Sequence, residues 1–374
     1  MMKADPIGLY VHIPFCVRKC AYCDFCSYPY SDISWREDYI HRLCAEISEY
    51  EGRNIKVNSI FFGGGTPSLL KEAEFRYIVG AIKKSFMISA DAEFTIEANP
   101  KTLTEKNLAS YIDCGVNRIS IGLQSIHENE LKSLGRIHNY TDFLDSYNLV
   151  RSLGIDNINV DLMYGIPEQT KESFAETLDS LIELAPEHIS VYGLILEEGT
   201  PLYKNRDALT LPSEDAECDM YYIASQKLSL AGYSHYEISN YAKLGYECRH
   251  NLKYWRCEEY IGVGVNAHSY FDGIRFANSD DISEYLDVKC KKYITEDISD
   301  STDEAYEYVM LRLRLAEGLS LSDYYLRFGE NFLEGRGPMI DKLRGLGYIG
   351  IQNDRLFLTE KGFYVSNAIL CELI

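Results

Sequence analysis

The chain has 374 residues, of which 46% are hydrophobic, so it can bury a large core and is long enough for two or three domains. Its formal net charge is -20 and no run of Lys or Arg stands out, so we expect no binding to nucleic acid. No stretch reaches the roughly 18 uninterrupted apolar residues of a spanning helix, and no secretory leader opens the chain. These features predict a cytoplasmic protein without stable membrane insertion.

Six apolar, β-branched runs alternate with longer segments of helical periodicity, which predicts βα units on a parallel sheet. Each run is bounded by Gly, Pro, Asn or Asp. The clearest helix covers Trp35–Glu51, with Asp32 or Ser34 as its N-cap. The predicted strands are Gly8–Ile13, Val57–Phe62, Glu93–Glu97, Arg118–Leu123, Asn157–Tyr164 and His188–Leu194.

Six units with such short strands favour an α/β fold, an open partial TIM-type (β/α)6 barrel, in which function gathers at the carboxyl ends of strands. Polar or glycine-rich residues lie at these ends. Cysteines follow the first strand, Gly63–Pro67 follows the second, Glu97 closes the third and Gln124 follows the fourth. Asp161 lies within the fifth strand. Any one of them could be a routine cap or barrel contact, but their shared position favours a functional site.

Changes in composition divide the chain into three predicted parts. Residues 1–235 form the barrel, and the aromatic, glycine-dotted residues 236–290 close it. Residues 291–374 form a small helical domain, with a helix at Asp303–Glu317 and a hairpin at Tyr348–Leu358 that turns at an Asn-Asp pair. A helical domain with such a wing often binds DNA, but the acidic balance argues against that role.

The segment Cys16-Val-Arg-Lys-Cys20-Ala-Tyr-Cys23 places three thiols within eight residues, close enough for one loop to surround an inorganic cluster. A structural zinc site or an electron-transfer cluster normally takes four protein ligands. Three ligands leave one iron open to an outside donor, such as the amino and carboxylate groups of S-adenosylmethionine (SAM). The scattered cysteines elsewhere in the chain are interpreted as buried hydrophobic residues.

The pattern CxxxCxxC, with an aromatic residue before the last cysteine and a GGGTP loop after it, resembles the radical SAM superfamily. The strings LYVHIPFC, GGGTP, IEANP, SIGLQS and DLMYGIP resemble its branch of oxygen-independent coproporphyrinogen III dehydrogenases and HemW-like heme chaperones. The resemblance covers nearly the whole chain. It implies a radical SAM barrel with a [4Fe-4S] cluster on Cys16, Cys20 and Cys23.

The resemblance also carries the SAM contacts of the family to eight positions of this chain. Glycine backbones permit close approach of the methionyl part, and carboxylates suit ribose hydroxyls and the cationic sulfonium. For the arginine among them, a surface ion pair is the competing interpretation. The eight positions are Tyr10, Gly64, Gly65, Thr66, Glu97, Gln124, Arg136 and Asp161.

Two departures separate the chain from the dehydrogenases of this branch. Those enzymes have a fourth cysteine two residues after the third, where this chain has Phe25, and its own Cys26 comes one residue later. Cys26 is then either a spectator thiol or a switchable ligand of the open iron. Only fifteen residues precede Cys16, whereas the dehydrogenases carry a long N-terminal arm that excludes water. Both departures favour the chaperones.

The string HNxxYW supplies His250, Asn251, Tyr254 and Trp255, and it is characteristic of the HemW-like group, where it is associated with heme binding. An imidazole can ligate iron, and the two aromatic rings can face a macrocycle. The competing interpretation is architectural: an aromatic segment that seals the barrel edge, with His250 hydrogen-bonded rather than liganded.

The function that we predict is that of a heme chaperone, which carries a [4Fe-4S] cluster and SAM, binds heme and transfers it to an acceptor protein. The partners considered are that heme-accepting protein and a second copy of the chain in a homodimer. One enzymatic alternative is oxidative decarboxylation of coproporphyrinogen III. The other is radical chemistry on a different tetrapyrrole, such as reductive opening of heme.

Overall fold

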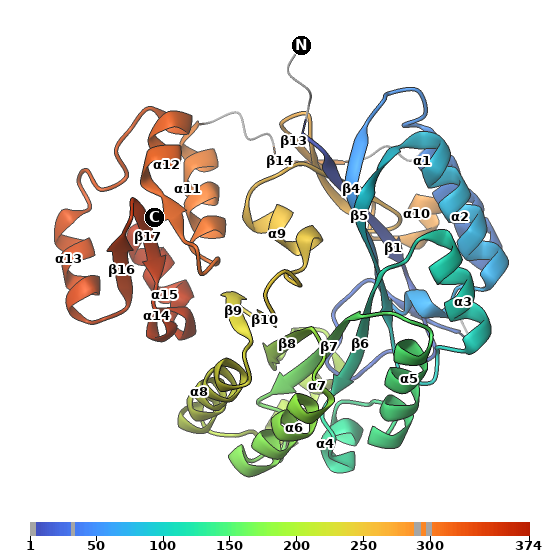
Figure 1. Ribbon diagram of the computed structural model, residues 1–374, viewed down its shortest axis with the longest axis horizontal. Helices are drawn as coiled ribbons and strands as arrows, with labels where there is room; N and C mark the ends of the chain where they lie inside the picture. Colours follow the sequence, from blue (N-terminus) through green and yellow to red (C-terminus); the bar gives the residue numbers. More distant parts are fainter. Residues whose placement is uncertain (1–4, 31–33, 288–292, 297–300) are drawn as a thin grey trace.

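A curved sheet of 12 strands forms the framework of the protein (Figure 1). The computed structural model describes residues 5–30, 34–287, 293–296 and 301–374. The strand order is β14-β13-β12-β11-β1-β4-β5-β6-β7-β8-β10-β9, and its two ends do not pair with each other. The predicted open, partial barrel is therefore confirmed.

The six central strands are parallel and follow one another in chain order, as predicted. They are β1 (Ile7–Ile13), β4 (Lys56–Gly64), β5 (Met87–Ala98), β6 (Arg118–Gln124), β7 (Asn157–Tyr164) and β8 (His188–Gly193). The helices that connect them are α1 (Arg36–Ser48), α2 (Glu72–Ser85), α3 (Glu105–Cys114), α4 (Glu128–Ser133), α5 (Tyr140–Ser152) and α6 (Lys171–Leu184). Helices α7 (Pro201–Lys204) and α8 (Glu214–Leu230) follow β8.

The N-terminus of α1 differs from the prediction. Trp35 is its N-cap, and no side chain caps the helix, so the assignment to Ser34 is wrong. The alternative cap, Asp32, lies outside the described residues.

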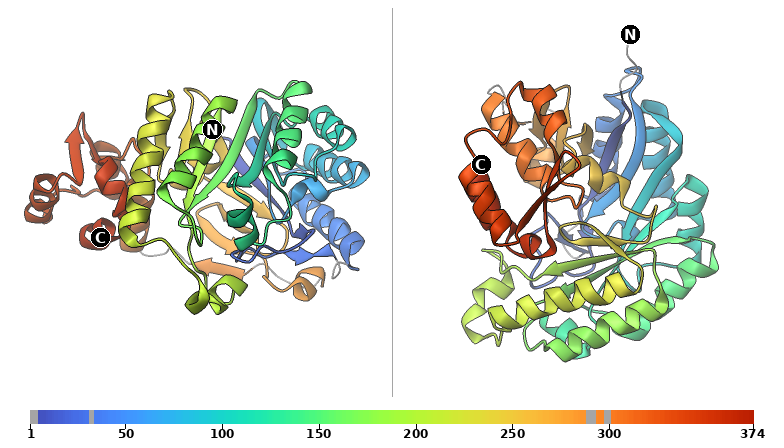
Figure 2. Two further views of the ribbon diagram at one scale, coloured as in Figure 1. Left: turned by 90° about the horizontal axis from the view of Figure 1, so that it is seen from below. Right: turned by 60° about the vertical axis from the view of Figure 1, so that its left-hand side comes forward.

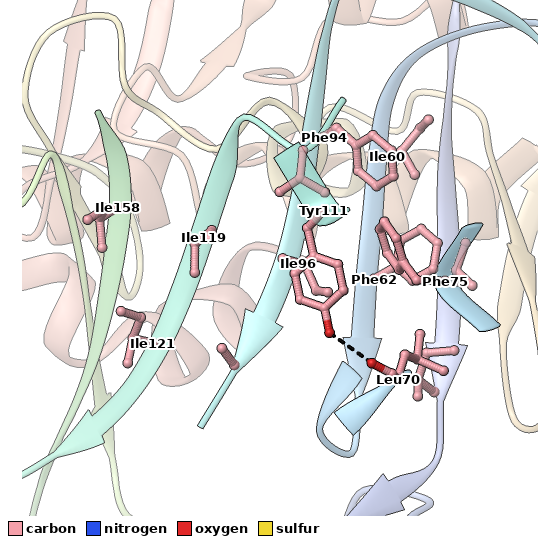
Figure 3. Close-up of a cluster of buried hydrophobic side chains, with 14 of the residues drawn as sticks. Ile60, Phe62, Leu70, Phe75, Phe94, Ile96, Tyr111, Ile119, Ile121 and Ile158 are labelled. Carbon is pink, nitrogen blue, oxygen red and sulfur yellow. Dashed lines mark hydrogen bonds between the residues drawn. The ribbon is translucent and has the colours of Figure 1, made fainter. Parts of the chain in front are cut away.

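Side chains alternate between the two faces of each central strand, because successive residues of a strand point to opposite sides. The outer face is apolar, and Figure 3 shows Ile119, Ile121 and Phe94 on it. Apolar side chains of the helices belong to the same buried cluster. Tyr111 of α3 joins this layer and donates its hydroxyl to the Leu70 carbonyl at 3.1 Å. Full burial of one such apolar side chain contributes ~1.5–3 kcal/mol, so this layer holds the barrel together.

The inner face of the same strands is polar. Arg118, Ser120 and Gln124 alternate along β6, and Asn159 and Asp161 alternate along β7. All five side chains line one internal cavity of about 390 Å³. The barrel thus has an apolar coat and a hollow, hydrogen-bonding interior.

The chain after β8 widens the sheet at both edges. Antiparallel strands extend the β8 edge, whereas a parallel strand and three antiparallel ones extend the β1 edge. Helix α9 (Arg249–Trp255) crosses the open side of the curve between these two additions (Figure 1). The added strands are β9 (Ser234–Glu237), β10 (Asn240–Ala242), β11 (Tyr260–Val263), β12 (His268–Phe271), β13 (Ile274–Ala277) and β14 (Tyr293–Glu296), with α10 (Ile282–Leu286) before the last.

A separate C-terminal domain lies beside the barrel, next to α8 (Figure 2). The predicted hairpin is confirmed, and Asn353 and Asp354 form its turn with φ of 50° and 63°. Tyr221 of α8 joins the apolar core of this domain. No helix in the described part of the chain is long and apolar enough to cross a membrane. The domain contains α11 (Ser301–Arg312), β15 (Leu319–Ser320), α12 (Leu321–Phe328), α13 (Gly337–Gly345), β16 (Ile349–Gln352), β17 (Arg355–Leu358), α14 (Glu360–Tyr364) and α15 (Ser366–Leu373).

Candidate functional site

The cysteine loop follows β1 at the carboxyl end of the sheet. Its base is closed by the pairing of β2 (Phe15–Cys16) with β3 (Tyr28–Pro29). Cys16, Cys20 and Cys23 all line one cavity of about 140 Å³. Among the described residues, no three His, Cys, Asp or Glu side chains lie close enough to hold a single metal ion. In a [4Fe-4S] cluster each thiolate binds a different iron, so its ligands are spread more widely than those of one ion.

The loop Gly63–Pro67 at the end of β4 packs directly against β2, the strand that carries Cys16. Gly65 donates its backbone N–H to the Ile13 carbonyl at 2.8 Å, and Thr66 donates to the Phe15 carbonyl at 2.7 Å. A Cβ atom at Gly65 would lie 2.7 Å from that Phe15 carbonyl oxygen. The Thr66 hydroxyl also reaches Cys16 Sγ at 3.6 Å. This loop therefore fixes the position of the first cysteine.

Replacing Gly65 with alanine should push the end of β4 away from β2 and cost ~1–3 kcal/mol of stability through overpacking. We expect less iron and sulfide after anaerobic reconstitution and a lower urea midpoint. Gly80 in α2 is a matched control, because a Cβ atom there meets nothing within 4 Å. Gly80→Ala should leave the iron content unchanged and raise the free energy of unfolding by ~0.5–1 kcal/mol. Normal reconstitution of Gly65→Ala would contradict the packing role.

The residues assigned to SAM lie together around the cysteines. Gly64, Gly65, Glu97, Gln124, Arg136 and Asp161 line the same 140 Å³ cavity as the three thiols. Glu97, Gln124 and Asp161 also line the adjoining 390 Å³ cavity, where Tyr10 lies. The two hollows therefore share a polar wall.

Arg136 lies inside the site rather than in a surface ion pair. Its Nη2 donates to Asn99 Oδ1 and to the Gly122 carbonyl, both at 2.5 Å. Its Nη1 lies 3.5 Å from Cys20 Sγ. Arg136 therefore places a cation beside one of the three predicted cluster ligands.

Two acidic side chains in the wall, Glu97 and Asp161, both have raised pKa values. Burial and the neighbouring Asp161 raise the pKa of Glu97 to about 8, although a bond from the Gly64 N–H at 3.1 Å opposes the rise. Burial also raises the pKa of Asp161, against hydrogen bonds from Asn159, Ser190 and Ser120. A cation bound between the two carboxyl groups would favour their ionised forms.

Helix α9 carries the HNxxYW string and closes one side of the barrel interior. The Glu93 carboxylate of β5 accepts the backbone N–H groups of Arg249 and His250, both at 3.0 Å. A carboxylate at a helix N-terminus satisfies free N–H groups and complements the helix dipole. Glu93 therefore fixes α9 to the sheet.

His250 is 1% exposed and has a partner at each ring nitrogen. Its Nδ1 lies 3.0 Å from Ser59 Oγ, and its Nε2 lies 2.8 Å from Tyr254 Oη. Burial, with the nearby Lys253 and Arg118 cations, lowers the pKa of His250 to about 3, so the ring is neutral. Both nitrogens are engaged, as the architectural interpretation requires.

The other members of the string divide between two places. Asn251 and Tyr254 line the 390 Å³ cavity together with His250. Trp255 does not line it; its ring faces the Arg314 guanidinium at 5.7 Å, close to the C-terminal domain. Only three of the four residues assigned to heme therefore face one space.

Several polar residues of the cavity were missed by the motif search. Besides Ser120 and Asn159 they are Arg118, His188, Ser190 and Tyr192. The missed signal is a period of two: in RISIGLQ, NINVDLMY and HISVYG, polar residues alternate with aliphatic ones. In a barrel, that alternation predicts a polar interior.

An open parallel sheet with three cysteines after its first strand defines the radical SAM class of fold. The family model described as "Radical SAM superfamily" matches residues 10–181, and the one described as "HemN C-terminal domain" matches residues 300–365. The solved structure of coproporphyrinogen III oxidase (HemN) from Escherichia coli superposes on this chain with a TM-score of 0.84. The superposition covers 99% of this chain and 90% of the HemN chain. The sequence identity is 24%, so this likeness supports the fold alone.

Curated relatives narrow this class. Heme chaperone HemW of Escherichia coli is 37% identical, over 99% of this chain and 98% of its own length. Heme chaperone HemW of Bacillus subtilis is 34% identical, over 96% of this chain and 97% of its own length. The chain therefore belongs to the HemW family of the radical SAM superfamily.

Proposed function

We propose that the protein is a heme chaperone, which binds heme and transfers it to an acceptor protein while it carries a [4Fe-4S] cluster and SAM. One observation carries the proposal. His250, Asn251 and Tyr254 face a cavity whose wall also contains the SAM candidates Glu97 and Asp161. Heme and SAM would therefore bind in one connected space, so that the binding of one could affect the binding or release of the other.

The residues around the cysteines fit a cluster and SAM. Three thiols line one cavity, and Arg136 supplies a cation beside Cys20. A cation such as the sulfonium would favour the ionised forms of Glu97 and Asp161, and Gln124 offers both donor and acceptor. When bound, the cluster supplies the electron that cleaves SAM. The protein side chains orient the nucleoside and exclude water.

The assignment of Trp255 to heme is harder to fit than the other three, because its ring lies under Arg314. His250 can reach an iron only after Tyr254 releases Nε2. We therefore propose that heme binding displaces the Tyr254 hydroxyl and moves part of α9. Tyr254 and Asn251 would then face the macrocycle.

Oxidative decarboxylation of coproporphyrinogen III is the second candidate, because the cysteine site is intact and opens into a polar cavity. Phe25, at the position of the extra dehydrogenase cysteine, is 69% exposed and cannot serve as a ligand. Radical chemistry on another tetrapyrrole, such as opening of heme, would use the same cavity.

One experiment separates the three functions. The anaerobically reconstituted protein is mixed with SAM and reductant, and with either heme or coproporphyrinogen III. Tetrapyrroles and nucleosides are then separated by chromatography. The chaperone proposal expects heme to be retained intact and coproporphyrinogen to remain unchanged. Protoporphyrinogen formed together with 5′-deoxyadenosine would make the protein a dehydrogenase, and a linear pigment would make it a heme-opening enzyme.

Glu97→Gln should stabilise the cofactor-free protein at high pH. The pKa of Glu97 is raised from 4.5 to about 8 on folding. The stability that this group contributes is therefore fully present below pH 4.5 and is lost as pH rises towards 8. Glutamine does not titrate, and the variant should gain ~1–3 kcal/mol over the parent near pH 8.5 and little near pH 5. Urea unfolding at both pH values measures this. An equal difference at both would contradict the assignment, and Glu105→Gln on the surface is the control.

A further inference from the structure

Arg118 is a fully buried cation that lacks a partner. Arg118 is the first residue of β6, its side chain lies on the inner face of the barrel, and the residue is 2% exposed. Nε has no hydrogen-bond acceptor, and in the described part of the chain the guanidinium forms no ion pair. The same side chain lines the 390 Å³ cavity. Buried arginines are normally paired, because an unsatisfied charge in a low-dielectric interior is costly.

Two acidic side chains that act on Arg118 electrostatically, Glu93 and Asp161, form their hydrogen bonds with other groups. Glu93 accepts the N–H groups at the start of α9 and the Cys248 thiol at 3.6 Å. Asp161 accepts from Asn159 Nδ2 at 2.8 Å and from Ser120 Oγ at 3.2 Å. Burial opposes the charge of Arg118, whereas Cys248 and then Glu93 and Asp161 act on it through space and raise its pKa. Neither carboxylate forms an ion pair with the guanidinium in the described part of the chain. The directional donors of the guanidinium remain free for a ligand.

The cavity around Arg118 has a long shape and mixed walls. It reaches from Arg118 at the start of β6 to Gln124 at its end, six residues or roughly 20 Å along an extended strand. Tyr10, Phe61 and Tyr254 give it aromatic walls. A guanidinium at one end, with apolar surface above it, suits a ligand with an apolar body and a terminal carboxylate.

We propose that Arg118 anchors a carboxylate-binding site in the barrel interior, which holds an organic acid with its apolar body directed towards the cysteine loop. Two sources supply this chemistry: a propionate arm of a tetrapyrrole, and the amino-acid end of a second nucleoside, separate from the SAM whose amino and carboxylate groups the open iron would take. The tetrapyrrole source rests on the proposed function, whereas the carboxylate site does not.

The test combines a change in the protein with a change in the ligand. The full chain, and its Arg118→Met and Arg118→Lys variants, are titrated with mesoporphyrin and with its dimethyl ester. Mesoporphyrin lacks iron, so axial ligation by His250 cannot contribute. A second arm uses S-adenosylhomocysteine and its methyl ester. Arg76→Met, at an exposed ion pair with Asp113, is the control.

In one arm we expect Arg118→Met to weaken binding of the acid by about 30-fold or more. Esterification of the ligand should weaken its binding to the parent by the same factor. The ester should bind the parent and Arg118→Met with the same affinity. Arg118→Lys keeps the charge near Glu93 and Asp161, and therefore the fold, but loses the planar fork; we expect an approximately tenfold loss.

The responding arm identifies the source of the carboxylate. Equal affinities of both acids for the parent and Arg118→Lys would overturn the proposal. So would a cost of esterification that is as large in the variants as in the parent. A failure of heme transfer with a positive result here would refute only the proposed function.

Discussion

Cys20→Ala is expected to abolish cluster assembly. In the described part of the chain, three thiols line the cluster cavity, and the loss of one leaves two irons without a protein ligand. Cys20 is also the thiol that Arg136 approaches at 3.5 Å, so its removal leaves that guanidinium without this contact. Anaerobic reconstitution should give negligible bound iron and none of the visible absorption of a [4Fe-4S] cluster.

Cys26→Ala is the matched control, since this thiol is directed elsewhere. Its Sγ lies 3.6 Å from the Asp280 carbonyl and 3.9 Å from Tyr28 Oη. The variant should assemble a normal cluster. Loss of the cluster in Cys26→Ala would instead support the role of a switchable ligand.

The same pair of variants tests whether the cluster is needed for heme transfer. Cys20→Ala should still bind heme, because the HNxxYW helix is fixed by Glu93 and not by the cysteine loop. We expect transfer to an acceptor apoprotein to fall at least tenfold. Unchanged transfer would show that the cluster and SAM do not gate release.

The scaffold of the barrel was predictable because burial leaves a strong local pattern. Ile119 and Ile121 are aliphatic since they face the helices, and the same alternation marks each of the six central strands. The turn at Asn353 and Asp354 was predictable for a similar reason, because both residues tolerate positive φ.

Long-range partners were not predictable from these patterns. No local signal shows that Glu93 caps a helix more than 150 residues later, or that β11 joins the sheet beside β1. His250 shows the limit most clearly. The motif supplies an imidazole, but only the fold places Ser59 and Tyr254 at its two nitrogens.

Tyr254→Phe should strengthen heme binding about tenfold, because it removes the hydrogen bond that competes with iron for His250 Nε2. His250→Ala should remove this gain and shift the Soret band by changing the axial ligand. The pKa of His250 is about 3, so the ring is already the neutral, iron-binding form. Its contribution to heme affinity should therefore stay constant from about pH 5 to pH 8 and fall only in stronger acid.

The architectural interpretation makes the opposite prediction for these variants. If His250 only seals the barrel, Tyr254→Phe leaves heme affinity unchanged and lowers stability by ~1 kcal/mol, the net loss of one buried hydrogen bond. His250→Ala then lowers the urea midpoint without moving the Soret band. Tyr77→Phe, on the exposed face of α2, controls for the general loss of a hydroxyl. Because heme affinity rises under the first interpretation and stays unchanged under the second, heme titration of Tyr254→Phe decides between them.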